Sequence, residues 1–151
     1  MTPGEFKDRL VSLMNDYIDE QIRARNWSPA DAGELARVQQ QRLLPHGLDT
    51  PGMHFYVART RADESVGYLW LATEPSDPIA GAAWIYAIEV DPDFRGRGLG
   101  RRLLAAAEHE ALRLGASAVA LNVFGPNHVA RHLYESSGYD VTSLQMRKSL
   151  G

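Results

Sequence analysis

Apolar residues follow a helical period at the start of the chain. They recur three or four positions apart over residues 6–18, and the pattern continues to about residue 25. The Thr-Pro-Gly-Glu sequence at residues 2–5 is typical of a capping box with proline in the first turn. Ser-Pro-Ala-Asp at residues 28–31 repeats the start signal, so we predict a second helix that Pro45 ends.

The pattern changes to that of strands after a loop with two prolines and two glycines at residues 45–52. Residues 54–60 and 66–72 are rich in β-prone side chains and flank a polar stretch, which predicts a hairpin. Two prolines within residues 74–78 indicate the next turn. Residues 80–90 are apolar on both faces, as is typical of a strand in the centre of a sheet.

Helical spacing returns in the second half. An apolar face over residues 103–114 predicts a third helix, and Gly115 suits its C-terminal cap. Residues 118–123 predict a short buried strand, and Asn127 can cap the helix that follows it.

Gly138 ends that last helix, and residues 139–150 are long enough for a terminal strand pair. The predicted order is α-α-β-β-β-α-β-α-β. This order gives an α/β (α+β) fold with a mixed central β-sheet flanked by helices. There is no repeat, linker or low-complexity stretch, so we expect residues 1–151 to form one domain.

The composition narrows the classes of function. Cysteine is absent, which excludes a disulfide framework, a thiolate metal site and a catalytic thiol. The net charge of −3 argues against a nucleic-acid surface. The N-terminus shows no secretory leader, and no apolar run reaches the ~20 residues that span a bilayer. We therefore expect a cytoplasmic protein that binds neither nucleic acid nor membrane.

The strongest chemical signal is a turn between the central strand and the third helix. Gly96, Gly98 and Gly100 let the backbone approach a ligand and adopt positive φ. Four arginines and no acid lie within eight residues: Arg95, Arg97, Arg101 and Arg102. N–H groups at a helix start attract an anion, so this turn suits a diphosphate. The alternative is a glycine-rich connector beside a solvated basic face.

This turn matches neither the Walker pattern nor the dinucleotide fingerprint, but it resembles the signature of the GNAT acetyltransferase superfamily. That signature is Gln or Arg, two free positions, Gly, one free position, then Gly or Ala, and residues 95–100 match each specified position. Residues 121–139 resemble the superfamily's second cofactor-side motif. The chain is thus similar to small, single-domain bacterial members, most closely over residues 84–150.

The resemblance implies acetyl-CoA as cosubstrate and no metal. Backbone groups of Ile88 and Val90 would pair with the pantetheine arm, beside Glu89 and Tyr134. Asn127 would hydrogen-bond the pantetheine, cap its own helix, or do both. The turn would hold the diphosphate through Arg95, Gly96, Arg97, Gly98, Leu99, Gly100 and Arg101.

The resemblance also suggests two catalytic residues. Tyr134 lies where many GNAT proteins place the residue that protonates the departing thiolate, and a phenol with a pKa near ~10 holds its proton at neutral pH. Glu89 ends the central strand in apolar company and would take a proton from the amine, directly or through water. Asn122 falls where some relatives carry an acid and cannot serve. The alternatives are a core tyrosine and a carboxylate that pairs with an arginine or points away from the cleft.

Other features carry less weight. His128 and His132 lie four apart on a predicted helix, but no third ligand is evident, so we expect surface residues. Aromatic residues in the middle strands either line the acceptor groove or belong to the core. The superfamily usually begins with a strand, which is short or missing here. The sheet edge that this leaves could be covered by a partner subunit in a homodimer.

We therefore predict an N-acetyltransferase that passes the acetyl group of acetyl-CoA to a primary amine, on a small molecule or on a protein N-terminus or lysine. A small amine is favoured because the loops at residues 27–28 and 45–52 could enclose a groove. The alternative is a non-catalytic sensor of CoA or acyl-CoA, which needs neither Tyr134 nor a base. A hydrolase of acyl-CoA is a third option.

Overall fold

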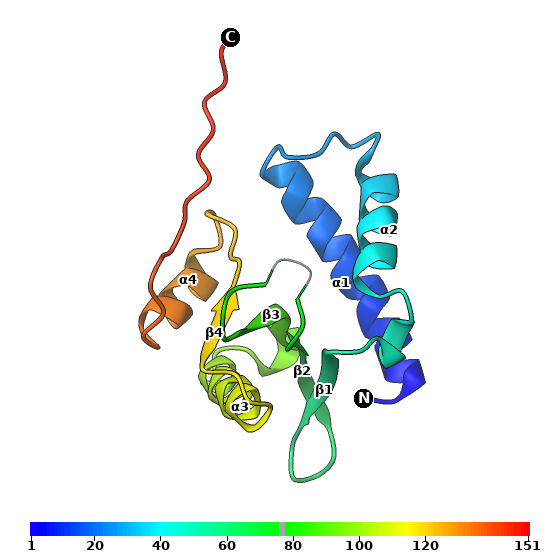
Figure 1. Ribbon diagram of the computed structural model, residues 1–151, viewed down its shortest axis with the longest axis vertical. Helices are drawn as coiled ribbons and strands as arrows, with labels where there is room; N and C mark the ends of the chain where they lie inside the picture. Colours follow the sequence, from blue (N-terminus) through cyan, green and yellow to red (C-terminus); the bar gives the residue numbers. More distant parts are fainter. Residues whose placement is uncertain (76–77) are drawn as a thin grey trace.

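The computed structural model describes residues 1–75 and 78–151 (Figure 1). Its helices are α1 (Pro3–Arg23), α2 (Ala32–Leu43), η1 (Gly47–Asp49), η2 (Pro92–Phe94), α3 (Leu99–Arg113) and α4 (His128–Glu135). Its strands are β1 (Met53–Arg59), β2 (Ser65–Ala72), β3 (Ala82–Val90) and β4 (Ala118–Leu121). They form one sheet in the order β1-β2-β3-β4, antiparallel except for the parallel pair β3–β4. The predicted mixed sheet flanked by helices is confirmed.

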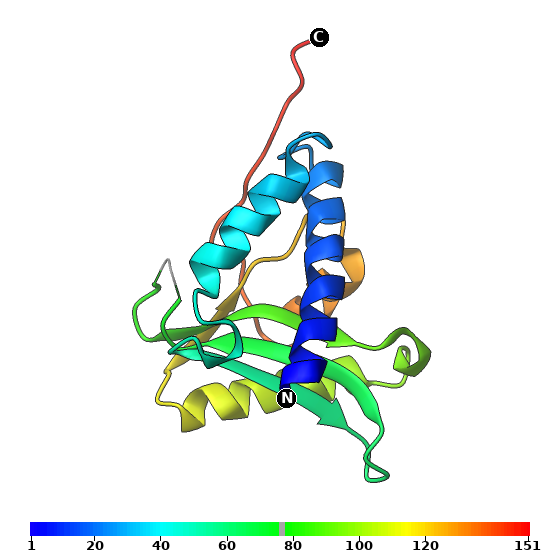
Figure 2. The ribbon, with the colours of Figure 1, turned by 90° about the vertical axis from the view of Figure 1, so that its right-hand side faces the viewer.

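The predicted capping box begins α1. The Thr2 N–H donates to Oε2 of Glu5 at 2.7 Å, and the Glu5 N–H donates to Oγ1 of Thr2 at 3.3 Å. These bonds satisfy two of the N–H groups that helix geometry leaves without partners. Helices α1 and α2 stand above one face of the sheet, and α3 lies beneath the other (Figure 2).

Each face of the sheet has its own core. Leu71 and Leu104 belong to the cluster between the sheet and α3. Tyr68 and Trp70 belong to a second cluster, which packs against the apolar side of α1 around Leu10. The two clusters fix β2 and β3 between α1 and α3, and these strands carry the polar groups described below.

A β-bulge in β3 decides which way Glu89 points. Trp70 of β2 pairs with Ala87. The next pair joins Leu71 to Ile85, so β3 has one residue more than β2 at this point. Side chains alternate between faces along a strand, and an extra residue reverses the alternation beyond it. Ile85 accordingly packs on the α3 face and Ala87 on the α1 face. Glu89, two residues further, therefore lies on the α1 face.

Strands β3 and β4 part halfway along β3. Their pairing ends at Ile85 and Leu121, where β4 stops. β3 continues to Val90 and stays paired with β2. On the β4 side, residues 87–90 therefore have no neighbouring strand among the residues that the structure describes. After this open edge, the chain passes through η2 into the glycine turn.

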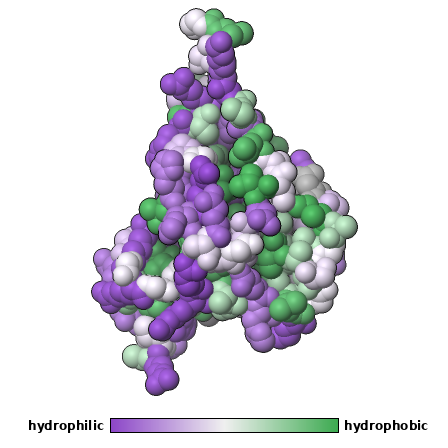
Figure 3. Space-filling view, turned by 90° about the vertical axis from the view of Figure 1, so that its left-hand side faces the viewer, coloured by the Kyte–Doolittle hydropathy of each residue, from purple (hydrophilic) through white to green (hydrophobic). Residues whose placement is uncertain are grey.

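The terminal strand pair predicted for residues 139–150 is wrong. After Glu135 the described chain forms neither helix nor strand, and Leu144 and Met146 are 76% and 88% exposed. A strand needs a neighbour for its N–H and C=O groups. Here the segment leaves α4 and projects away from the sheet (Figure 1). In Figure 3 it forms a mostly hydrophilic column beside which hydrophobic side chains are visible.

Three smaller predictions concern the ends of elements. No strand precedes α1 in the described chain, in line with the expected short or missing first strand. The second helix begins at Ala32, with Asp31 as its N-cap, which is later than its start signal suggested. The turn predicted at residues 74–78 lies partly outside the described residues. Within residues 1–75 and 78–151, no helix has the length and apolar character needed to cross a membrane.

Candidate active site

Two glycines of the predicted diphosphate turn adopt left-handed conformations. Gly96 has a φ of 74°, and Gly98, the N-cap of α3, has a φ of 75°. Side chains larger than hydrogen disfavour this region. A Cβ atom built on either residue would find no other atom within 4 Å, apart from its chain neighbours. The main chain is therefore bare and open to solvent here, and a ligand can contact it directly.

The same turn presents a run of free N–H groups. Helix α3 has no side-chain cap, and its first backbone bond runs from the N–H of Arg102 to O of Gly98 at 3.4 Å. Among the described residues, no group accepts a hydrogen bond from the N–H groups of residues 96–101. Free N–H groups at the positive end of a helix dipole form a site for an anion.

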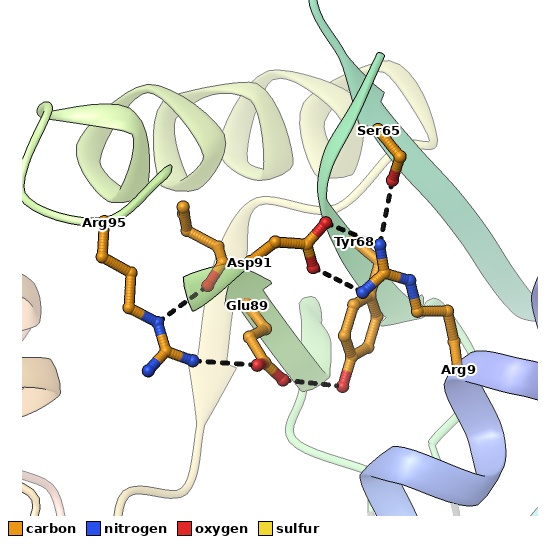
Figure 4. A network of polar contacts seen from close by, with 7 residues as sticks. Arg9, Ser65, Tyr68, Glu89, Asp91 and Arg95 are labelled. Atoms are coloured by element: carbon orange, nitrogen blue, oxygen red, sulfur yellow. Dashed lines mark hydrogen bonds and ion pairs between the residues drawn. The ribbon is translucent and has the colours of Figure 1, made fainter. Parts of the chain in front are cut away.

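Arg95 folds back onto the end of β3. Its Nε donates to O of Val90 at 2.9 Å, and its Nη2 donates to Oε1 of Glu89 at 3.0 Å (Figure 4). The Arg95 side chain is 58% exposed, so solvent and an incoming ligand can reach it. One side chain thus links the predicted diphosphate turn to the predicted base.

The other arginines of the turn lie elsewhere. The guanidinium of Arg97 lies 5.5 Å from the centre of the Phe94 ring. Arg101 donates to Oγ of Ser136 at 2.8 Å and to Oγ of Ser137 at 3.0 Å, against the C-terminal end of α4. The Arg101 side chain therefore points toward α4, and only its N–H group is directed at the turn.

Glu89 lies between two donors. Its Oε1 accepts from Arg95, and its Oε2 accepts from the Tyr68 hydroxyl at 3.2 Å (Figure 4). The expectation of apolar company for this carboxylate is wrong. The pairing with an arginine, left open as the alternative, is the observed arrangement. The Glu89 side chain keeps 30% of its surface exposed.

Tyr68 supports Glu89 from the neighbouring strand, where the two residues face each other on the antiparallel ladder. Burial and the charge of Glu89 raise the pKa of the Tyr68 hydroxyl, which therefore keeps its proton and remains a donor. Gly67 brings the strands close together. A Cβ atom there would lie 2.2 Å from the carbonyl oxygen of Glu89.

A second ion pair ties α1 to the end of β3. Arg9 donates to the two carboxylate oxygens of Asp91 at 2.5 and 2.8 Å and to Oγ of Ser65 at 2.9 Å. Its guanidinium also lies 5.2 Å from the centre of the Tyr68 ring. Bidentate pairs of this kind are strong and directional. The sequence analysis missed Arg9 and Asp91, because residues 82 positions apart share no local pattern.

Tyr134 lies on α4 and packs into the α3-side core, with its ring centre 5.8 Å from that of Tyr139. Burial raises the pKa of the Tyr134 hydroxyl. In the described part of the chain this hydroxyl has no hydrogen-bond partner. The geometry is that of a core tyrosine whose polar end is available to a ligand.

Asn127, Ile88 and two histidines of α4 are the remaining candidate residues. Oδ1 of Asn127 accepts from the N–H of Ala130 at 3.1 Å, so Asn127 caps α4 as predicted. Ile88 packs on the α3-side core within the open part of β3. His128 and His132 are exposed. Within the described ranges, no group of three or more His, Cys, Asp or Glu residues is placed to hold a metal ion.

Comparison with known proteins shows which family the chain belongs to. Residues 11–139 match the Acetyltransferase (GNAT) family, and the chain belongs to that family. The resemblance read from the glycine turn is therefore confirmed.

Several relatives match over most of the chain. "Uncharacterized N-acetyltransferase YycN" of Bacillus subtilis (strain 168) is 35% identical over 150 residues, which cover 99% of this chain and 96% of the relative. "Uncharacterized N-acetyltransferase YdgE" of the same organism is 31% identical, covering 99% and 95%. A mycothiol acetyltransferase of Propionibacterium freudenreichii is 32% identical over 141 residues, which cover 89% of this chain but 44% of the relative.

Solved structures agree on the fold. The crystal structure of YycN superposes with a TM-score of 0.92 at 35% identity, covering 99% of this chain and 95% of that chain. The aminoglycoside N-acetyltransferase AAC(6')-Iy, solved in complex with CoA, superposes with a TM-score of 0.57 at 17% identity. That alignment covers 83% of this chain and 96% of the other, and it shows a shared fold.

Proposed function

We propose that this N-acetyltransferase family member takes acetyl-CoA as its donor and passes the acetyl group directly to a primary amine. The observation that carries the proposal is the meeting of two features at the end of β3. The strand has an open edge beyond Ile85, and a turn with free N–H groups follows it. An extended chain of amides can pair with a strand edge, and a diphosphate suits a helix start.

The residues fit such a donor. The bare glycines and the N–H groups of residues 96–101 would hold the diphosphate, with Arg95 and Arg97 adding charge. Backbone groups of Ile88 and Val90 would pair with the pantetheine arm. Asn127, as the cap of α4, would order the start of the helix that carries Tyr134.

Acid and base would act from opposite faces of the sheet. Glu89 lies on the α1 face and would take a proton from the attacking amine, directly or through one water. Tyr134 packs on the α3 side and would return a proton to the departing sulfur. The raised pKa of the Tyr134 hydroxyl favours this role, because the phenol stays protonated until negative charge develops on the departing sulfur. The amine would then approach from the α1 side.

A small-molecule amine is the favoured acceptor. The Tyr17 ring of α1 lies 5.4 Å from Trp27 and 6.4 Å from Phe124, centre to centre, so α1 meets the loop after β4. These contacts would limit the space through which an acceptor reaches the α1 side of the sheet. The relatives named mycothiol acetyltransferase bear the name of a small molecule, although the match covers less than half of the first of them. A protein N-terminus or lysine is the competing acceptor.

The test is release of free thiol from acetyl-CoA in the presence of a panel of amines, with mass spectrometry of the products. The proposal predicts thiol release that depends on the amine and an equal amount of acetylated amine. Thiol release without any amine would indicate a hydrolase. Tight CoA binding without release across peptide and small-molecule amines would indicate a sensor.

A further inference from the structure

The Arg95 side chain lies across the open end of β3. It donates to the Val90 carbonyl at 2.9 Å and to the Glu89 carboxylate at 3.0 Å. We propose that Arg95 makes the site selective for pantetheine ligands that carry a diphosphate, because its side chain covers this edge until it moves to bind the phosphates. The inference rests on the proposed function, and it concerns the discrimination between CoA and phosphate-free pantetheine.

The Val90 carbonyl belongs to the open edge. Successive carbonyls of a strand point to opposite sides in the plane of the sheet. The Glu89 carbonyl points toward β2, since a Cβ atom on Gly67 would lie 2.2 Å from its oxygen. The Val90 carbonyl therefore points away from β2, toward the side that β4 has left, and Arg95 is its donor there. A pantetheine amide that binds this carbonyl must replace Arg95.

Phosphates can draw the Arg95 side chain away from Val90 and Glu89, whereas pantetheine has no charged group to do so. Arg95 precedes the free N–H groups of residues 96–101, and its exposed guanidinium needs only a change of rotamer to face an anion held there. A diphosphate offers two charges and a bidentate partner, whereas Arg95 otherwise contacts one carboxylate oxygen of Glu89 and one carbonyl oxygen. A ligand without phosphates must break the contacts of Arg95 to Glu89 and Val90. It offers the guanidinium no other anion to bind.

The experiment measures the binding of CoA and of pantetheine by calorimetry to the wild type, Arg95→Ala and Arg102→Ala. For Arg95→Ala we expect opposite effects on the two ligands. CoA should bind about tenfold more weakly, because a charged phosphate contact is lost. Pantetheine should bind about threefold more tightly, since an exposed ion pair no longer competes. Arg102→Ala removes a charge from the first turn of α3, close to the same glycine turn. Arg102 has no hydrogen bond to Glu89 or Val90 among the described residues, so pantetheine binding should not change.

Glu89→Gln is the second variant. It removes the charge that holds the Arg95 side chain and leaves the sequence of the glycine turn unchanged. It should also tighten pantetheine binding and leave CoA binding within about twofold of the wild type. Tighter pantetheine binding in the Arg95 and Glu89 variants than in the wild type and in Arg102→Ala supports the inference. Equal pantetheine binding in all proteins, or none in any, overturns it, as does parallel weakening of both ligands. Failure of the wild type to bind CoA would instead refute the proposed function.

Discussion

The Tyr68 hydroxyl donates to Oε2 of Glu89 at 3.2 Å, across the ladder that joins β2 to β3. Tyr68 is only 3% exposed, so its ring is fixed by the α1-side core and by the cation of Arg9 above it. The bulge near Trp70 turns Glu89 to the same face as this hydroxyl. The proposed base is therefore oriented by the core of the protein as well as by the exposed Arg95.

Replacing Tyr68 with phenylalanine tests this orientation. Tyr68→Phe keeps the ring and removes the donor, so Glu89 samples more rotamers when the amine arrives. We expect kcat to fall about tenfold, which corresponds to one hydrogen bond to a charged group. The dissociation constant for CoA should not change. A KM increase at constant kcat would contradict a positioning role and indicate that Tyr68 contacts the acceptor.

Gly98→Trp should abolish CoA binding. The indole would fill the open space over the turn, at a residue with φ of 75°. Gly98→Ala is the control for backbone strain, because it carries about the same cost of roughly 1–2 kcal/mol without filling the site. Circular dichroism should show folded protein for both variants. Unchanged CoA affinity in the tryptophan variant would refute the assignment of the turn.

Tyr134→Phe should slow turnover more than it weakens binding. The proposed acid contributes about a hundredfold or more to kcat, whereas the ring alone maintains the packing against Tyr139. The pH profile gives a second readout. Burial raises the pKa of Tyr134, so its protonated form persists as pH rises. In the wild type, kcat should hold up to at least the ordinary tyrosine value of ~10 and fall above it. An equal kcat in Tyr134→Phe would show that this residue only packs.

Arg9→Ala should destabilise the fold. The Arg9 and Asp91 side chains are 26% and 18% exposed, and the pair joins α1 to the end of β3. We expect the free energy of unfolding to fall by about 1–3 kcal/mol in urea denaturation. Arg37→Ala is the matched control, because its pair with Glu34 is 55% and 65% exposed and contributes less than about 1 kcal/mol. Equal losses in the two variants would contradict a structural role for Arg9.

Local sequence patterns predicted much of the fold and the glycine turn that begins α3. The capping box of Thr2 and Glu5, the cap of Asn127 and the glycines before α3 each depend on residues a few positions apart. Such signals can be read from the chain itself.

Features that depend on tertiary contacts could not be predicted in this way. The bulge opposite Trp70 appears only in the register of two strands, and it decides the face on which Glu89 lies. Arg9 and Asp91 form an ion pair although 82 positions separate them in the sequence. The segment after Gly138 is long enough for a pair of strands, but a strand forms only where another strand can pair with it.

The most direct test of the account is a calorimetric titration of purified protein with CoA and with acetyl-CoA. The free N–H groups of residues 96–101 and the open edge of β3 predict saturable binding of both ligands at one site per chain. Loss of that binding in Gly98→Trp would locate it. Absence of any heat of binding with either ligand at millimolar concentration would contradict the account.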